Sequence, residues 1–235
     1  MFKKILLAFI TSSLMLSAAN LKIAAGAGYK KPLMEIIEEY EKSGDKIEAI
    51  FGHLKQVTTQ ATQTDITLII GDKNFLVDKS GLTFKDFTTL GEGELVIVYA
   101  KDKKISSIED LANENIKRIT IPDPSKAIYG IAGTEFLKNS KLEEKVKDKL
   151  LVVATVPQAM TYILTNEVDA GLVNLSEAIA NKDNIGGYIK VDKKYFSPIE
   201  IVIGKLDTCN TKECEKFLNF LSTPTAKNIF NKYGL

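Results

Sequence analysis

The sequence predicts an α/β protein of two lobes with a hinge and a cleft between them. From residue 21 onward, apolar strand patterns alternate with amphipathic helix patterns, which is typical of parallel sheets covered by helices. Two apolar strands, around residues 95–100 and 198–204, have the position of passages between two such groups. With 235 residues, 45% of them hydrophobic, the chain is long and apolar enough to bury these cores.

The first group opens with a strand–turn–helix–strand unit. Leu21 to Ala25 have the pattern of a short buried strand that runs into Gly26-Ala27-Gly28. Apolar residues at helical spacing predict a helix that ends at Ser43-Gly44: Leu33, Ile36, Ile37 and Tyr40. The next expected elements are a strand over 46–51, a polar helix over 55–63 and a strand over 66–70 that Gly71-Asp72 closes. This order is the βαβ unit of a parallel sheet.

The second group begins after the apolar strand over 95–100. Ser107 and Asp110 indicate a helix start before residues 108–113. The further expected elements are strands over 119–121, 150–154 and 169–173, and helices over 131–139, 159–164 and 176–181, the last capped by Ser176. A strand over 201–203 and helices over 214–221 and 225–233 close the chain. We therefore expect one lobe from residues 20–98 and 197–235, and a second lobe from residues 99–196.

The first nineteen residues have the three-part pattern of a secretory signal peptide. A basic start with Lys3 and Lys4 precedes an apolar run and small residues that end at Ala19. A membrane anchor is the alternative, but the run is about a dozen residues, short of the ~20 that a spanning helix needs. Cleavage near Ala19 changes the formal net charge from +1 to −1, since two Lys are lost. We expect an exported, periplasmic chain with no membrane span in its mature part.

Export bears on the two cysteines, Cys209 and Cys214. Four residues separate them, whereas a thioredoxin-like redox pair has two. A small loop in an oxidising compartment favours a structural disulfide at the start of a late helix. Two free thiols remain the alternative.

Composition argues against several classes of function. The near-zero charge is unlike a nucleic-acid binder that neutralises many phosphates. One His and two Cys argue against a zinc site and against His-based catalysis. The third glycine of a dinucleotide fingerprint is replaced by Lys31, and neither a phosphate-binding P-loop nor a nucleophile elbow occurs. We expect no enzyme activity, no cofactor and no free metal cation, with an exported hydrolase as a minor alternative.

Four turns that follow strands and precede helices are the candidate binding elements. Ligands of open α/β sheets bind beyond the carboxyl ends of the strands, and N–H groups at helix starts favour anions. Each turn alone has the ordinary chemistry of a strand–helix loop; only their combination indicates a site. The turns are Gly26-Ala27-Gly28-Tyr29, Gly52-His53-Leu54-Lys55, Ala127-Ile128-Tyr129-Gly130 and Thr155-Val156-Pro157.

Four carboxylates at strand ends or turns have two possible roles. Such groups can serve acid–base chemistry, but more often they cap helices or stabilise turns, and they repel an anion. They are Asp65, Asp72, Asp123 and Asp169. His53 is the one His, and its plainest interpretation is a surface-loop residue with no part in binding.

Several segments together resemble one family, the periplasmic molybdate- and tungstate-binding proteins of ABC importers, which have the type II solute-binding fold. The similarity spans nearly all of the mature chain. The segments are Leu21-Lys22-Ile23-Ala24-Ala25-Gly26-Ala27-Gly28, Thr64-Asp65-Ile66 with Gly71-Asp72, Asp123-Pro124 with Tyr129-Gly130-Ile131, Asn166-Glu167-Val168-Asp169-Ala170-Gly171, and Ala226-Lys227-Asn228-Ile229-Phe230-Asn231-Lys232-Tyr233-Gly234.

The resemblance implies five binding positions for a tetrahedral dianion held by backbone N–H groups, two Ser hydroxyls and a Tyr hydroxyl. They fall at Gly28, Lys55 (within one residue), Tyr129, Val156 and Asn174. Here Gly28 and Lys55 stand where the family has Ser, and Asn174 stands where it has Tyr. Lys55 is then expected to return charge and Asn174 to offer an amide donor.

The same resemblance implies a monomer that binds molybdate or tungstate and delivers it to a membrane permease. Because three side-chain donors differ, a binder of another anion is the alternative, with sulfate, a phosphate-like anion or an organic acid as ligand. A surface adhesin or antigen built on the same fold is a more distant one.

Overall fold

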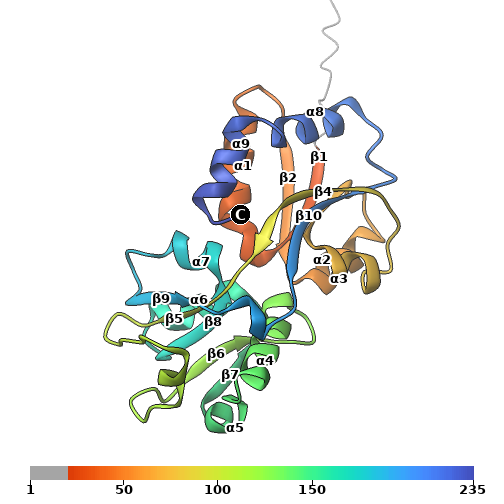
Figure 1. The fold of residues 1–235 in the computed structure, drawn as a ribbon. Coiled ribbons are helices and arrows are strands. Elements are labelled where there is room, and N and C mark those ends of the chain that lie inside the picture. The colour runs from red at the N-terminus through yellow and green to blue at the C-terminus, as the bar shows by residue number, and fades with distance from the viewer. Residues whose placement is uncertain (1–20) are drawn as a thin grey trace, which may run out of the picture.

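A computed structural model describes residues 21–235 and shows two sheet-and-helix halves (Figure 1). The predicted signal peptide, residues 1–19, lies outside the described residues. Within the described part, each half contains a five-stranded sheet, with strand orders β2-β1-β3-β10-β4 and β7-β6-β8-β5-β9. Most strands of both sheets are lined with Ile, Leu, Val and Ala that are fully buried under helices. The predicted α/β class is therefore confirmed.

The first sheet is parallel in its first three strands. β1 (Leu21–Gly26) lies between β2 (Ile47–Gly52) and β3 (Leu68–Asp72) and pairs in parallel with both. β10 (Ile199–Leu206) returns from the second half and pairs antiparallel with β3 and with β4 (Phe84–Gly93). Because β1 and β2 are parallel, their carboxyl ends at Gly26 and Gly52 lie side by side, and both turns leave from the same edge of the sheet.

The second sheet contains a strand, β5, through which the lobe boundary expected from the sequence would pass. β5 (Leu95–Tyr99) pairs antiparallel with β8 (Ala170–Asn174) and β9 (Gly187–Lys190). The expected boundary at residue 98 thus falls inside a strand whose pairings all lie in the second sheet. Its apolar residues, Leu95 to Val98, are fully buried there. The parallel strands β6 (Ile119–Pro122) and β7 (Leu150–Val153) complete the sheet.

The helices largely follow the apolar spacing seen in the sequence. Around the first sheet they are α1 (Lys30–Glu41), α2 (Leu54–Ala61), α3 (Lys73–Asp78), α8 (Lys212–Leu221) and α9 (Pro224–Lys232). Around the second they are α4 (Ile128–Asn139), α5 (Glu143–Val146), α6 (Val156–Leu164) and α7 (Leu175–Ala180). Short 3₁₀ turns lie at Ala27–Tyr29, Ile108–Ala112, Lys147–Lys149 and Lys193–Tyr195.

Two expectations about helix starts are corrected. Residues 108–113 were expected to form a helix, but only a 3₁₀ turn forms there, although Asp110 does accept the N–H of Ser107 (3.0 Å). Ser176 does not cap the next helix. α7 begins at Leu175, directly after β8, so Asn174 is the N-cap and Ser176 is a buried residue of the first turn.

The sequence missed β4, β9, α3 and α5. β4 is an edge strand whose side chains are mostly half-buried or exposed, so its sequence lacks an apolar run. β9 has four residues, and α3 has six. Elements this short carry too few positions for a periodic pattern to stand out.

The four singled-out carboxylates have structural partners. Asp72 caps α3 by accepting the N–H of Phe75 (2.8 Å), and Asp65 pairs with Lys22 (2.8 Å). Two others hold loops of the second half: Asp123 accepts from the N–H and hydroxyl of Ser125, and Asp169 accepts from the N–H of Lys117 and Arg118. Asp72 thus caps a helix, Asp123 and Asp169 stabilise loops, and Asp65 is held in a surface ion pair.

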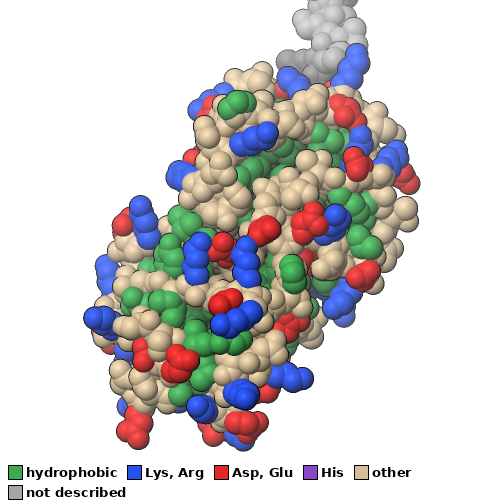
Figure 2. All heavy atoms as spheres, in the orientation of Figure 1, with side chains coloured by type: hydrophobic (Ala, Val, Ile, Leu, Met, Phe, Trp, Pro, Cys, Tyr) green, Lys and Arg blue, Asp and Glu red, His purple; other side chains and the backbone are tan. Residues whose placement is uncertain are grey.

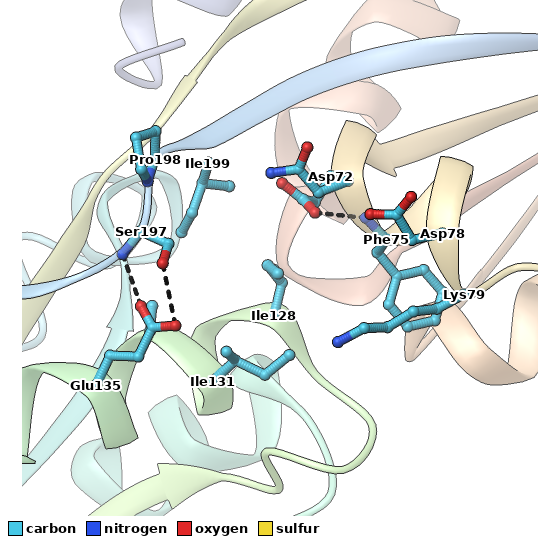
Figure 3. A pocket seen from close by; sticks show the side chains of 12 residues that line it. Asp72, Phe75, Asp78, Lys79, Ile128, Ile131, Glu135, Ser197, Pro198 and Ile199 are labelled. Atoms are coloured by element: carbon cyan, nitrogen blue, oxygen red, sulfur yellow. Dashed lines mark hydrogen bonds between the residues drawn. The ribbon is translucent and has the colours of Figure 1, made fainter.

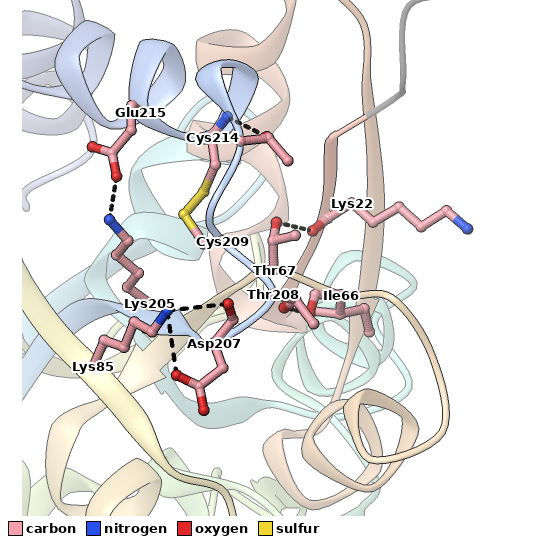
Figure 4. Close-up of a disulfide and its surroundings, with 11 residues drawn as sticks. Lys22, Ile66, Thr67, Lys85, Lys205, Asp207, Thr208, Cys209, Cys214 and Glu215 are labelled. Atoms are coloured by element: carbon pink, nitrogen blue, oxygen red, sulfur yellow. Dashed lines mark hydrogen bonds and ion pairs between the residues drawn. A yellow bond between two sulfur atoms is a disulfide. The ribbon is translucent and has the colours of Figure 1, made fainter.

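Cys209 and Cys214 form a disulfide at the start of α8, with their Cα atoms 5.6 Å apart (Figure 4). Both residues are buried, and Thr211 caps the helix from inside the small loop that the bond closes. The disulfide thus ties the end of β10 to the helix that covers Tyr40 of α1, whose ring lies 5.1 Å from that of Phe217. Among the described residues, no helix has the length and apolar character needed to span a membrane.

Removing this disulfide should lower stability without changing the fold. For a loop of this size, closure entropy predicts a loss of about 2 kcal/mol, or a melting temperature lower by roughly 4–8 °C. Thermal unfolding of the C209S/C214S variant measures the effect. Reductant should lower the melting temperature of the parent protein to the same extent and leave the variant unchanged; a parent protein indifferent to reductant would contradict the assignment.

Candidate functional site

The four turns selected from the sequence meet at one small cavity between the two sheets. Its volume is about 30 Å³. The first half contributes the β1–α1 turn and the first residue of α2, and the second half contributes the starts of α4 and α6. The lining residues are Gly26, Ala27, Gly28, Tyr29, Leu54, Ala127, Ile128, Tyr129 and Val156.

Backbone N–H groups are the main polar donors that these helix starts offer. The first N–H groups of a helix have no acceptor within that helix. Outside the ladders of the described helices and strands, no protein acceptor lies in hydrogen-bonding geometry with the N–H groups of Gly28, Lys55, Tyr129 or Val156. Helix dipoles add partial positive charge at each start. The cavity is therefore suited to an acceptor that carries negative charge.

The side chains around the cavity are apolar or phenolic, and no charged residue lines it. Interactions inside such a lining are stronger than in water because the local dielectric constant is low. On the face shown in Figure 2, basic and acidic side chains are interspersed rather than gathered by sign. Attraction of an anion to this site must then come from donors close to it.

Two side-chain hydrogen bonds cross between the halves at the cavity. The hydroxyls of Tyr29 and Tyr129 lie 2.8 Å apart, and both residues are buried. Burial raises the pKa of each phenol, so both stay protonated at neutral pH. The second bond runs from Asn174 Nδ2 to the carbonyl oxygen of Gly28 (2.9 Å).

Two of the expected binding positions, Gly28 and Asn174, contact each other. A Cβ atom at Gly28 would lie 3.2 Å from Asn174 Nδ2 and 3.4 Å from its Cγ, closer than side-chain carbons normally pack. A side chain at position 28 would therefore require the amide of Asn174 to shift by a few tenths of an ångström.

The five expected positions are brought together to different degrees. Gly28, Tyr129 and Val156 line the cavity. Asn174 reaches its edge through Gly28, but its Nδ2 is already used on the Gly28 carbonyl and its Oδ1 is buried without a partner among the described residues. The Lys55 side chain is exposed and does not line the cavity; its neighbour Leu54 does.

Sequence reasoning missed Tyr29 and Leu54 as lining residues. Both belong to turns that the sequence singled out, and each is adjacent to an expected position. What the sequence lacked was the direction of each side chain, which depends on how the turn leaves its strand.

His53 has a structural role at the start of α2. Its Nδ1 accepts the N–H of Gln56 (3.1 Å) and caps the helix. Burial, with the Lys126 ammonium of the other half nearby, lowers the pKa of His53 from its ordinary value, which keeps the imidazole neutral and able to accept at neutral pH.

A larger cavity of about 250 Å³ lies between α3 and α4 (Figure 3). Carboxylates line it from both halves: Asp72 and Asp78 from the first, Glu135 from the second. Glu135 accepts the N–H of Ser197 (2.6 Å) and its hydroxyl (3.1 Å). With only Lys79 as a cation in its lining, this cavity is less suited to an anion than the small one. Across residues 21–235, no three His, Cys, Asp or Glu side chains are placed to hold a metal ion.

Comparison with known proteins finds similar proteins along the whole described chain. The family model for bacterial extracellular solute-binding proteins matches residues 21–235. The candidate ABC transporter substrate-binding lipoprotein YvgL of Bacillus subtilis (strain 168) is 32% identical over 226 residues, covering 92% of this chain and 85% of its own. The molybdate-binding protein ModA of Rhodobacter capsulatus is 27% identical, covering 93% and 88%.

A solved structure supports the fold. The periplasmic molybdate-binding protein of Azotobacter vinelandii superimposes with a TM-score of 0.82 at 22% identity, covering 92% of this chain and 98% of its own. At this level of identity the similarity concerns the arrangement of strands and helices.

Replacing Asn174 tests the bond between the halves. Asn174→Ala leaves the Gly28 carbonyl buried without a donor and should lower the free energy of unfolding by about 1–3 kcal/mol. Asn174→Asp should be more harmful at pH 7, because a carboxylate would face a carbonyl oxygen. Its pKa would be raised in the folded state, so the lost stability should return as the pH falls and the acid becomes a donor.

Denaturant unfolding of both variants between pH 4 and pH 7 measures these effects. Asn181→Ala is a matched control, because Asn181 donates to Glu177 within the second half only. A pH dependence of Asn174→Asp equal to that of the parent protein would contradict the contact.

Proposed function

Because the chain belongs to the bacterial extracellular solute-binding proteins, we propose that it captures a tetrahedral oxyanion, molybdate or tungstate, for import by an ABC transporter. The relatives named as molybdate-binding proteins support the choice of ligand. The ligand site is the small cavity, and no covalent chemistry is required of it.

The observation that carries this proposal is the meeting of four helix starts at a cavity without charged side chains. N–H groups that point into the cavity from four helix starts, two in each half, suit a tetrahedral ion with four oxygens. The small volume favours a compact ion over an extended organic molecule. Gly28, Tyr129 and Val156 donate through their backbone, and Lys55 does the same through its N–H while its ammonium stays in solvent.

Closure of the two halves explains how an ion can be held without a counter-ion. Water around the anion is replaced by N–H groups that already point to the cavity, so little reorganisation is needed when the anion enters. The donors come from both halves, so the site is complete only when the halves are together. Binding therefore favours the closed form over the open one.

The two halves act as lobes, residues 20–94 with 197–235 and residues 95–196, so the boundary expected at residue 98 moves to Glu94, before β5. The chain is exported through its signal peptide and works as a monomer in the periplasm. A membrane permease recognises the closed form and accepts the ion from it.

Titration with a panel of anions tests the ligand. Molybdate or tungstate at one hundred times Kd should stabilise the folded state by about 2.7 kcal/mol and raise the melting temperature by roughly 5–10 °C. Sulfate, phosphate and small organic acids serve as comparison ligands in thermal-shift and calorimetric measurements. A response to one of these, with none to molybdate or tungstate, would refute the choice of ligand.

A single N–H group can be removed at Val156 with little disturbance. Val156 is the first residue of α6, where proline is tolerated, and Thr155 before it is extended, as a residue preceding proline must be. Val156→Pro should weaken oxyanion binding roughly 10–100-fold, the worth of one hydrogen bond to a charged group. Val156→Ala keeps the N–H and should bind within a few-fold of the parent protein. Equal affinities of the two variants in calorimetry would rule out the Val156 N–H as a donor.

A further inference from the structure

The hydrogen-bonded pair of Tyr29 and Tyr129 joins the two halves. Both tyrosines line the small cavity, while Ile128, next to Tyr129, lines both cavities. The Tyr129 hydroxyl lies beside Gly93, which also packs against Ile199, a lining residue of the larger cavity. The joined hydroxyls thus form part of the wall that divides the space between the halves.

Gly93 provides the room for this wall at the passage between the sheets. A Cβ atom there would lie 2.4 Å from the Tyr129 hydroxyl oxygen and 2.6 Å from Ile199 Cγ2. Neither distance is compatible with a side chain. The absence of a side chain at Gly93 lets the Tyr129 hydroxyl reach that of Tyr29.

Counting protons shows that the pair keeps one donor. Two hydroxyls have two protons, and the bond between them uses one. Neither hydroxyl has another hydrogen-bond partner among the described residues. Asp72 is close enough to raise the pKa of both phenols, yet its Oδ2 is buried without a hydrogen-bond partner. The remaining O–H is therefore available to an acceptor in the cavity.

We propose that Tyr29 and Tyr129 determine the specificity of the site: their joined hydroxyls close it toward the larger cavity and present one O–H to a ligand oxygen. The site then takes a compact inorganic oxyanion and rejects one that carries an organic group. This inference rests on the proposed function, since it concerns the same ligand.

The test compares tungstate or molybdate, sulfate and phosphate with phenyl phosphate, by calorimetry on the whole mature chain. The parent protein should bind an inorganic oxyanion at least about tenfold more tightly than phenyl phosphate. The double variant Y29F/Y129F should lose roughly tenfold or more in inorganic affinity, because no phenolic donor remains. Tyr129→Ala should bring the two affinities closer by about tenfold, because it opens the wall.

The single Phe variants distinguish a shared donor from two independent ones. The hydroxyl that faces the ligand should account for nearly all of the double-variant loss, and its partner for little. Tyr162→Phe is the matched control, since the Tyr162 hydroxyl makes no hydrogen bond in the described structure and lies outside both cavities. Melting curves without ligand check that each variant is folded, and the Phe variants keep the buried rings.

Three failures are distinguishable. If the parent protein binds an inorganic oxyanion but the Phe and Ala variants keep its affinity and selectivity, this inference is wrong and the proposed function stands. If the parent protein binds phenyl phosphate as tightly as the inorganic ions, the dividing wall is refuted. If it binds no inorganic oxyanion at all, the proposed function fails and the inference fails with it.

Discussion

The structure depends on unpaired N–H groups that two halves of the chain bring to one apolar place. Each half contributes two helix starts, and neither half encloses the cavity alone. Backbone N–H groups that are buried without acceptors are unfavourable, so the closed arrangement creates a requirement for an acceptor. Under the proposed function, a ligand that meets this requirement stabilises the closed form, and binding and closure become one event.

Two side-chain hydrogen bonds join the halves beside the cavity. The amide of Asn174 lies against Gly28 and donates to its carbonyl oxygen. The phenols of Tyr29 and Tyr129, held neutral by burial, are hydrogen-bonded to each other.

Within the described residues, no charged side chain lines the small cavity, although Asp72 is close enough to raise the pKa of both phenols. Asp72, Asp123 and Asp169 are engaged in capping a helix and holding loops, and Lys55 points to solvent. A carboxylate close to the ligand would repel an anion, and a fixed ammonium would hold any anion regardless of shape. In the proposed site, donors of fixed direction, rather than charge, leave shape and size as the basis of selection.

The sequence by itself determined the α/β class, the order of most helices and strands, and the four turns that form the cavity, because apolar spacing and turn residues act over a few neighbouring positions. It could not place β5 in the second sheet, since a buried apolar strand has the same pattern in either sheet. Short or edge elements such as α3 and β4 were not predicted, because their few or partly exposed residues give no clear local pattern. Only the tertiary structure decided that Leu54 rather than Lys55 faces the cavity, that Asn174 binds the Gly28 carbonyl, and that Tyr29 meets Tyr129. These contacts join residues about a hundred or more positions apart, and their geometry follows from how the two sheets are oriented, which no local pattern encodes.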